Sequence, residues 1–340
     1  MSLTSRSLLA AAALALCAAV PAQAQGVVIK MATLVPKGSE WHQVLQEMAD
    51  GWQKASKGQV QVKLYPGGVA GDDSDVVRKM RLGTLNAGVL TITGLADIDR
   101  ASMALEIPLA YADYAELDCA LAKLAPMLEQ RIDAKGFVLL GWTDGGYVRF
   151  LTKDPVKTPA DLKKAKLFTW AGDDAYVELW KSAGFNPVPL PATELATGLQ
   201  TGLINATLTT PGLALLSGWF NTAKHMTDLP WAVLLGGVVV NQSAWEKIPA
   251  DVRTEMQRIA REAGKKLSTI ARAGESRDIA AMQKRGLDLV AVDPPALEQW
   301  RKLVADVMPK LKGKFLPADA LDAGLKARDE CRAASKSGGR

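Results

Sequence analysis

Hydrophobic positions along this chain alternate between two periods. Short β-branched runs indicate strands, and apolar residues spaced three and four apart indicate helices. The expected strands are residues 27–33, 60–65, 87–93, 166–170, 186–190 and 206–210. The expected helices are residues 41–57, 72–85, 117–136, 173–183 and 193–201. This alternation predicts two successive α/β units.

Two extended segments are placed to connect these units. Residues 147–152 lie between the first unit and the second, and the apolar residues 233–241 follow the second. A chain that crosses out and back forms a hinge between two lobes. The expected division is lobe I from 25–147 with 236–270, lobe II from 148–235 with 271–316, and a C-terminal helix and tail from 317–340.

The longest periodic segment, residues 251–285, predicts a helix too long for one lobe. Its 35 residues would extend about 50 Å, against about 30 Å for a small domain. We therefore expect it to run behind both lobes. Gly264 and Gly274 could mark bends. Two ordinary helices broken near Gly274 are the alternative.

The N-terminus is typical of a cleaved export signal. Arg6 supplies a positive charge, residues 8–20 are apolar, and Ala22-Gln23-Ala24 resembles a cleavage site. A lipid anchor at Cys17 is less favoured, because Leu16 stands where a small residue would be expected. No later segment is a candidate membrane span. We therefore expect a periplasmic protein beginning near residue 25.

Charge, length and cysteine content narrow the range of possible functions. Removing 24 of 340 residues, including Arg6, leaves 316 residues and lowers the formal charge from +5 to +4. The basic residues are interleaved with acidic ones, so a nucleic-acid partner is not expected. Only Cys119 and Cys331 remain after cleavage. Whether they form a disulfide is left open.

Catalytic chemistry has little support in the sequence. His42 and His225 fall in different predicted lobes, and no metal-ligand spacing or nucleophile motif occurs. The pairs Asp72-Asp73 and Asp173-Asp174 stand at predicted helix starts, where acidic residues stabilise the helix. We expect no enzyme activity, cofactor or metal. A periplasmic enzyme remains the less favoured alternative.

Four short segments together resemble the periplasmic binding subunit of tripartite ATP-independent periplasmic (TRAP) transporters, the DctP family. They are Pro36-Lys37-Gly38-Ser39; Tyr65-Pro66-Gly67-Gly68 with Gly71-Asp72-Asp73 and Leu82-Gly83-Thr84-Leu85; residues 157–163; and Thr193-Glu194-Leu195 with residues 198–202. The resemblance covers nearly the whole chain after the signal. It implies a two-lobed periplasmic binding protein fold, a long helix spanning both lobes, and a cleft that closes on a small molecule.

The resemblance also implies partners, and one departure from it bears on the ligand. The partners would be the small and large TRAP membrane subunits, and a ligand-sensing adaptor of the same fold is the alternative. The family's carboxylate-binding arginine aligns with Phe168, which offers no charged hydrogen bond. Such a strand resembles a subgroup proposed to carry hydrophobic ligands, sometimes with a tetratricopeptide partner. The expected ligand is apolar, aromatic or weakly polar, organic acids included.

Several residues are candidates for the ligand site. Six tryptophans between residues 142 and 245 favour an apolar cleft in lobe II. Trp170 and Asp173 stand where a strand passes into a helix, a common ligand position in α/β sheets. Arg149 lies one residue from a second ligand-facing arginine of the family and is an alternative cation. Trp180 is expected to be core.

The other candidates follow from their place in the expected fold or in the resemblance. Trp245 is expected to be structural and is left out of the site. Trp41 and the turn at Thr93 and Gly94 would form the opposing wall in lobe I, and the remaining candidates lie at strand ends or crossings. They are Tyr147, Thr209, Thr210, Pro211 and Asn241.

Overall fold

The computed structural model describes residues 26–338, so the predicted signal peptide lies outside the described residues. Its strands largely match the predicted ones. They are β1 (Val27–Thr33), β2 (Val60–Tyr65), β3 (Ala87–Thr91), β4 (Phe137–Thr152), β5 (Lys166–Trp170), β6 (Asn186–Leu190), β7 (Ala206–Thr209), β8 (His225–Thr227), β9 (Ala232–Asn241) and β10 (Asp288–Val290). The order across the sheet is β2-β1-β3-β9-β4-β7-β5-β6, and β8 pairs with β4 on one side and with β10 on the other.

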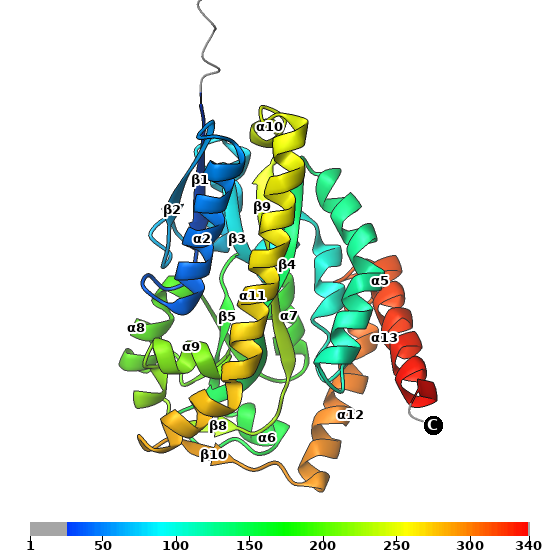
Figure 1. Cartoon of the computed structure of the whole chain (residues 1–340). Helices are drawn as coiled ribbons and strands as arrows, with labels where there is room; N and C mark the ends of the chain where they lie inside the picture. The colour runs from blue at the N-terminus through cyan, green and yellow to red at the C-terminus, as the bar shows by residue number, and fades with distance from the viewer. Residues whose placement is uncertain (1–25, 339–340) are drawn as a thin grey trace, which may run out of the picture.

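The helices cover this sheet in two groups. They are α2 (Glu40–Ala55), α3 (Asp73–Arg81), α4 (Ile92–Ile98), α5 (Tyr114–Asp133), α6 (Pro159–Leu162), α7 (Asp174–Ser182), α8 (Leu195–Thr201), α9 (Pro211–Leu216), α10 (Gln242–Trp245), α11 (Ala250–Gln283), α12 (Pro294–Leu311) and α13 (Ala318–Gly338). Three short 3₁₀ helices are η1 (Arg100–Leu105), η2 (Ala192–Glu194) and η3 (Trp219–Asn221). Two α/β lobes result, as predicted (Figure 1).

The two predicted connections are the strands that the lobes share. β9 pairs antiparallel with β3 and with β4, while the second half of β4 pairs with β7 and β8. The β4–β9 register shifts between Asp144 and Tyr147, where Gly146 has φ +88°. A bulge of this kind bends a strand locally. The bend therefore lies where the chain leaves lobe I.

The predicted long helix is one continuous helix, α11, that runs beside both lobes (Figure 1). The alternative of two helices broken near Gly274 is therefore wrong. A Cβ on Gly264 would lie 2.2 Å from the Trp142 carbonyl oxygen, and one on Gly141 would lie 3.0 Å from the Ala260 oxygen. Gly264 thus permits direct contact with β4 where we expected a bend.

Ion pairs fix the lower part of α11 to β4. Arg272 pairs with Asp118 and with the buried Asp144, both at 2.7 Å. Glu275 accepts hydrogen bonds from Arg149 and, at 2.9 Å, from the Tyr114 hydroxyl. Because charged side chains this far from water need partners, these contacts hold the helix and the bent strand in one arrangement.

Four apolar clusters form the core, two associated with each lobe. The α2 and α11 side of lobe I includes Trp52 and Trp245, which confirms Trp245 as a core residue. The α5 and α13 side of the same lobe is a second cluster. In lobe II, Phe150 stacks on Trp300 of α12 at 5.1 Å, and a separate cluster around Phe220 lies near α8 and α9.

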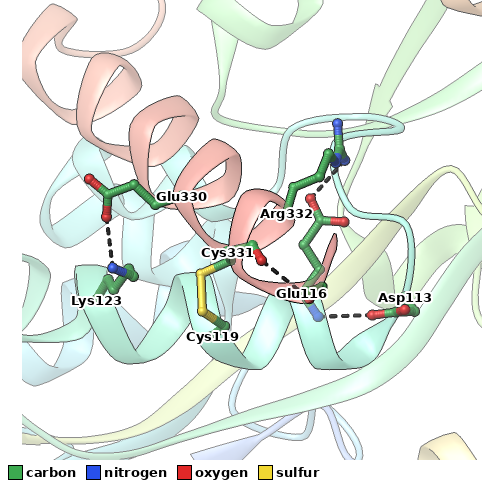
Figure 2. Close-up of a disulfide and its surroundings, with 8 residues drawn as sticks. Asp113, Glu116, Cys119, Lys123, Glu330, Cys331 and Arg332 are labelled. Carbon is green, nitrogen blue, oxygen red and sulfur yellow. Dashed lines mark hydrogen bonds and ion pairs between the residues drawn. A yellow bond between two sulfur atoms is a disulfide. The ribbon is translucent and has the colours of Figure 1, made fainter. Parts of the chain in front are cut away.

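Cys119 and Cys331 form a disulfide that joins α5 to the C-terminal helix α13 (Figure 2). The question left open by the sequence is thereby answered. Lys123 pairs with Glu330 at 2.7 Å, and Arg332 pairs with the buried Glu116 at 2.7 Å. Figure 2 shows both pairs beside the disulfide. The C-terminal helix is therefore fixed to lobe I.

Two predicted strands end early because threonines cap the helices that follow them. The Thr91 hydroxyl accepts from the Thr93 N–H, so Thr93 and Gly94 lie in α4 and not in a turn as expected. The Thr210 hydroxyl likewise accepts from the Leu213 N–H at the start of α9. Between residues 26 and 338, no helix has the length and apolar character of a membrane span.

Candidate functional site

A cavity of about 380 Å³ lies between the lobes and continues into lobe II. Its volume is within the range of about 300–1,000 Å³ typical of small-molecule sites. Lobe I contributes Leu34 and Pro36 just after β1, the Thr91–Thr93 segment, Met103 and residues 106–108. Lobe II contributes β5, β7, α7, α9 and α12. The cavity therefore occupies the interlobe position that the sequence predicted for a ligand.

The sheet of lobe II separates the cavity lining in this lobe into two compartments, one on each face of β5. Phe168, Trp170 and Trp219 line the compartment near α8 and α9, on one face of β5. Trp180 and Trp231 line the compartment between α7 and α12, on the other face. The lining of the cavity is thus mostly apolar. Four of the six tryptophans singled out from the sequence border it.

Five of the predicted site residues line this cavity: Thr93, Phe168, Trp170, Asp173 and Thr209. Phe168 and Trp170 are in edge-to-face contact, with ring centroids 5.7 Å apart. They project from the same face of β5 because strand residues two apart share a face. Phe168 and Trp170 therefore stand side by side in the cavity wall.

Four other candidates do not reach the cavity because local backbone or core contacts occupy them. Gly94 packs within α4 against Asp73 and Leu90. Thr210 caps α9, and Pro211 is its first residue. Asn241 caps α10, and its amide donates to the Met80 and Leu85 carbonyl oxygens at 3.2 and 3.4 Å.

The remaining three candidates lie at the hinge or beside the cleft. Arg149 is buried with its guanidinium paired to Glu275, and it is not among the residues that line the cavity. Tyr147 stacks on Tyr114, with ring centroids 4.7 Å apart. Trp41 lies against Gly212, where an added Cβ would be 3.1 Å from the indole ring. Trp41 thus contacts lobe II from lobe I without lining the cavity.

Contacts across the cleft join the lobes. The Ala192 N–H donates to Asp72 Oδ2 at 2.8 Å. Arg100 Nη2 donates to both oxygens of Asp173, at 2.9 and 3.1 Å, and the guanidinium covers the Phe315 ring at 4.3 Å. Polar contacts therefore join the lobes at two places, Asp72 with Ala192 and Arg100 with Asp173.

The paired aspartates at the helix starts have structural roles in the described chain. Asp72 caps α3 and Asp173 caps α7, as predicted. Asp73 Oδ2 accepts from the Thr91 N–H and hydroxyl at 2.9 and 2.6 Å. Burial raises the pKa of Asp73 to about 7, against the opposing effect of the Thr91 hydroxyl. Within residues 26–338, no group of three or more His, Cys, Asp or Glu side chains could hold a metal ion.

Sequence reasoning missed part of the wall. Trp180 is buried as expected, with 7% of its surface exposed, but it also borders the cavity. Leu303, Val304 and Val307 of α12 close the compartment next to it. Glu106 was missed altogether, because a single carboxylate between two apolar residues matches no motif. Its position becomes visible only once residues 103–108 are folded against α7.

Comparisons with known proteins agree with this architecture. The model of the DctP family, "Bacterial extracellular solute-binding protein, family 7", matches residues 31–314. The chain is 26% identical over 254 residues to the 2,3-diketo-L-gulonate-binding periplasmic protein YiaO of Escherichia coli, covering 73% of this chain and 76% of that one. It is also 26% identical over 321 residues to the C4-dicarboxylate-binding periplasmic protein DctP of Rhodobacter capsulatus, covering 90% and 94%.

A solved structure shows the same fold. The sugar acid binding protein DctPAm of Advenella mimigardefordensis, in complex with galactonate, superposes with a TM-score of 0.84 at 17% identity, covering 90% of this chain and 99% of that one. Since the family model spans most of the chain, the assignment does not depend on this pairwise likeness. The protein belongs to the DctP family, the TRAP-type periplasmic solute-binding proteins, which bind solutes and are not enzymes.

Proposed function

We propose that this protein captures a small, mainly apolar or aromatic organic ligand, organic acids included, between its lobes. The main support is the composition of the cavity wall. Among the described residues that line it, none is a lysine or arginine, while Phe168, Trp170, Trp180, Trp219 and Trp231 are aromatic. An apolar body of a ligand fits such a wall by burial of its surface.

The same wall disfavours small dianions. A carboxylate taken from water without a charged partner costs several kcal/mol. Phe168 stands where the family resemblance places a guanidinium, and Arg149 is bound to Glu275. A C4-dicarboxylate would bring two charges into a cavity without a facing cation. A monocarboxylate with a large apolar part brings only one.

The named relatives support organic acids as the broad ligand class. One is named for 2,3-diketo-L-gulonate, one for C4-dicarboxylates, and one was solved with galactonate. The family also supports the partners. We infer delivery of the ligand, in the periplasm, to the small and large membrane subunits of a TRAP-type secondary transporter. A tetratricopeptide periplasmic protein is a further partner in this proposal.

Lobe closure would couple binding to delivery. Ligand burial between the lobes favours the closed form, and the closed form presents the surface that the membrane subunits bind. The contacts of Asp72 with Ala192 and of Arg100 with Asp173 join residues of different lobes across the cleft. They therefore belong to the closed form in this cycle.

Calorimetric titration of the purified protein with octanoate and with succinate tests the proposed ligand class. We expect octanoate to bind saturably with a negative heat-capacity change, as burial of apolar surface requires. Succinate should bind at least about tenfold more weakly. Tighter binding of succinate than of octanoate would contradict the proposal.

A further inference from the structure

One carboxyl group faces the apolar cavity without a partner. Glu106 follows η1, and it lines the cavity together with Ile107 and Pro108. Its side chain makes no hydrogen bond or ion pair with any of the residues from 26 to 338. Carboxyl groups in apolar surroundings are normally satisfied by a donor or a cation, so this one is available to a ligand.

The charged and titratable groups around Glu106 do not neutralise it. Of the described residues that line the cavity, the others that titrate are Asp173 and Tyr176. The Asp173 carboxylate already pairs with Arg100 and accepts a hydrogen bond from the Tyr176 backbone N–H. Burial away from water raises the pKa of Glu106 to about 8. At neutral pH, Glu106 is therefore mostly a neutral carboxylic acid that can donate a hydrogen bond.

A second unused donor borders the same compartment. Trp180 Nε1 is buried and has no hydrogen-bond partner among the described residues. Its polar neighbour is the Tyr176 hydroxyl. The Trp180 N–H lies close to this hydroxyl without the geometry of a hydrogen bond, and burial and the nearby Glu106 raise the pKa of Tyr176. Glu106, Tyr176 and Trp180 therefore bring three neighbouring polar groups to an otherwise apolar part of the cavity.

We propose that Glu106 and Trp180 form a subsite that donates hydrogen bonds to an oxygen acceptor of the ligand, a carboxylate or a carbonyl. This inference rests on the proposed function and specifies the polar end of the apolar ligand. A hydrogen bond from a carboxylic acid to a carboxylate is short and about twice as strong as a neutral one. A carbonyl oxygen would use the same two donors more weakly.

Aromatic rings around a carboxylate could instead hold an organic cation. The donor at Trp180 argues against this reading, since an indole N–H can only donate and a cation offers it no acceptor. The Trp180 indole N–H and the protonated Glu106 carboxyl both need a hydrogen-bond acceptor. The two readings predict opposite pH dependence, because a cation needs ionised Glu106 and an acceptor needs the protonated form.

The test compares octanoate, octanamide and octyltrimethylammonium, which share one apolar tail. Binding to the full mature protein is measured by calorimetry from pH 6.5 to 9.5, for wild type, Glu106→Gln, Glu106→Leu and Trp180→Phe. Glu178→Gln is the matched control, because Glu178 is an exposed carboxylate on α7 paired with Lys181. Free octanoate is ionised throughout this pH range, and a pH dependence that Glu106→Gln abolishes is assigned to Glu106.

We expect wild type to bind octanoate about tenfold more weakly at pH 9 than at pH 7, because Glu106 loses its proton. Glu106→Gln should keep most of the affinity at pH 7 and lose this pH dependence, since an amide still donates. Glu106→Leu should bind octanoate at least about tenfold more weakly at pH 7. Trp180→Phe should weaken octanoate and octanamide but keep the wild-type pH profile, and Glu178→Gln should match wild type.

Two results would overturn the inference while leaving the proposed function intact. One is octanoate binding that is the same in wild type, Glu106→Leu and Trp180→Phe. The other is preferred binding of octyltrimethylammonium that strengthens as pH rises through 8. Failure of every octyl probe to bind wild type would overturn the proposed function itself, and the subsite with it.

Discussion

The ion pair between Arg100 and Asp173 joins the lobes across the cleft, so removing it should weaken ligand binding more than it weakens folding. Asp173→Asn is the suitable change. The amide oxygen of Asn can still accept the Tyr176 N–H that caps α7, at 3.0 Å in the wild type. Arg100 would keep its hydrogen bond to the Phe315 carbonyl oxygen and its contact with the Phe315 ring. Only the interlobe charge pair is lost.

The magnitude follows from the exposure of the pair. The Asp173 side chain is 9% exposed and that of Arg100 is 30% exposed, so water screens the pair in part. A charge-assisted hydrogen bond is worth about 1.5–3 kcal/mol when buried, and screening reduces this to about 1–2 kcal/mol. If the contact exists only in the closed form, affinity falls by the same free energy, about 5- to 30-fold.

Titration with octanoate measures this effect, and thermal unfolding of the unliganded protein provides the comparison. Asp174→Asn is the matched control, because Asp174 is the exposed neighbour of Asp173 on α7. We expect weaker octanoate binding by Asp173→Asn and near wild-type binding by the control. Unchanged affinity in Asp173→Asn would refute the view that this pair stabilises the closed form.

Four further changes test other parts of the structure. Trp170→Ala should weaken octanoate binding by about tenfold or more in fluorescence titration, since it removes apolar wall; equal affinity would exclude Trp170 from the wall. Phe168→Arg should improve succinate binding relative to octanoate, because it supplies a guanidinium in the cavity; an unchanged preference in a folded variant would contradict this. Replacing both Cys119 and Cys331 with Ser should lower the free energy of unfolding by about 2–5 kcal/mol in denaturant titrations and leave octanoate affinity unaltered. Equal stability of this variant and wild type would count against a stabilising disulfide. Burial raises the pKa of Asp73 above its unfolded value of 3.8 to about 7, so the free energy of unfolding should fall as pH rises between these two values. Relative to Asp73→Asn, the fall should be up to about 1.4 kcal/mol per pH unit, and parallel curves of unfolding free energy against pH for the two proteins would contradict this.

The sequence predicted the architecture well because its signals are local and repeated. Strands at residues 27–33, 60–65, 166–170 and 186–190 agree with the structure. Errors arose where a threonine at or just after a strand end caps the next helix: Thr91 is the last residue of β3 and caps α4, and Thr210 follows β7 and caps α9. Strand propensity and capping favour the same residue type there, so periodicity cannot locate the boundary.

The site was less predictable because its wall is assembled from distant segments. Phe168 and Trp170 were recognised from their strand and from the family resemblance, and both line the cavity. Arg149 was a candidate because of its position in the sequence. Only the folded structure shows that its guanidinium pairs with Glu275 on α11. Glu106 gives no sequence signal, because its significance comes from the absence of partners around it.

The proposed ligand class is decided by what fills the cavity of about 380 Å³ between the lobes. Native mass spectrometry of gently purified protein, followed by identification of the released compound, tests this most directly. We predict one bound molecule per chain, with a large apolar or aromatic body and a single oxygen-acceptor end. Recovery of a C4-dicarboxylate or another small polyanion as the bound molecule would contradict the account.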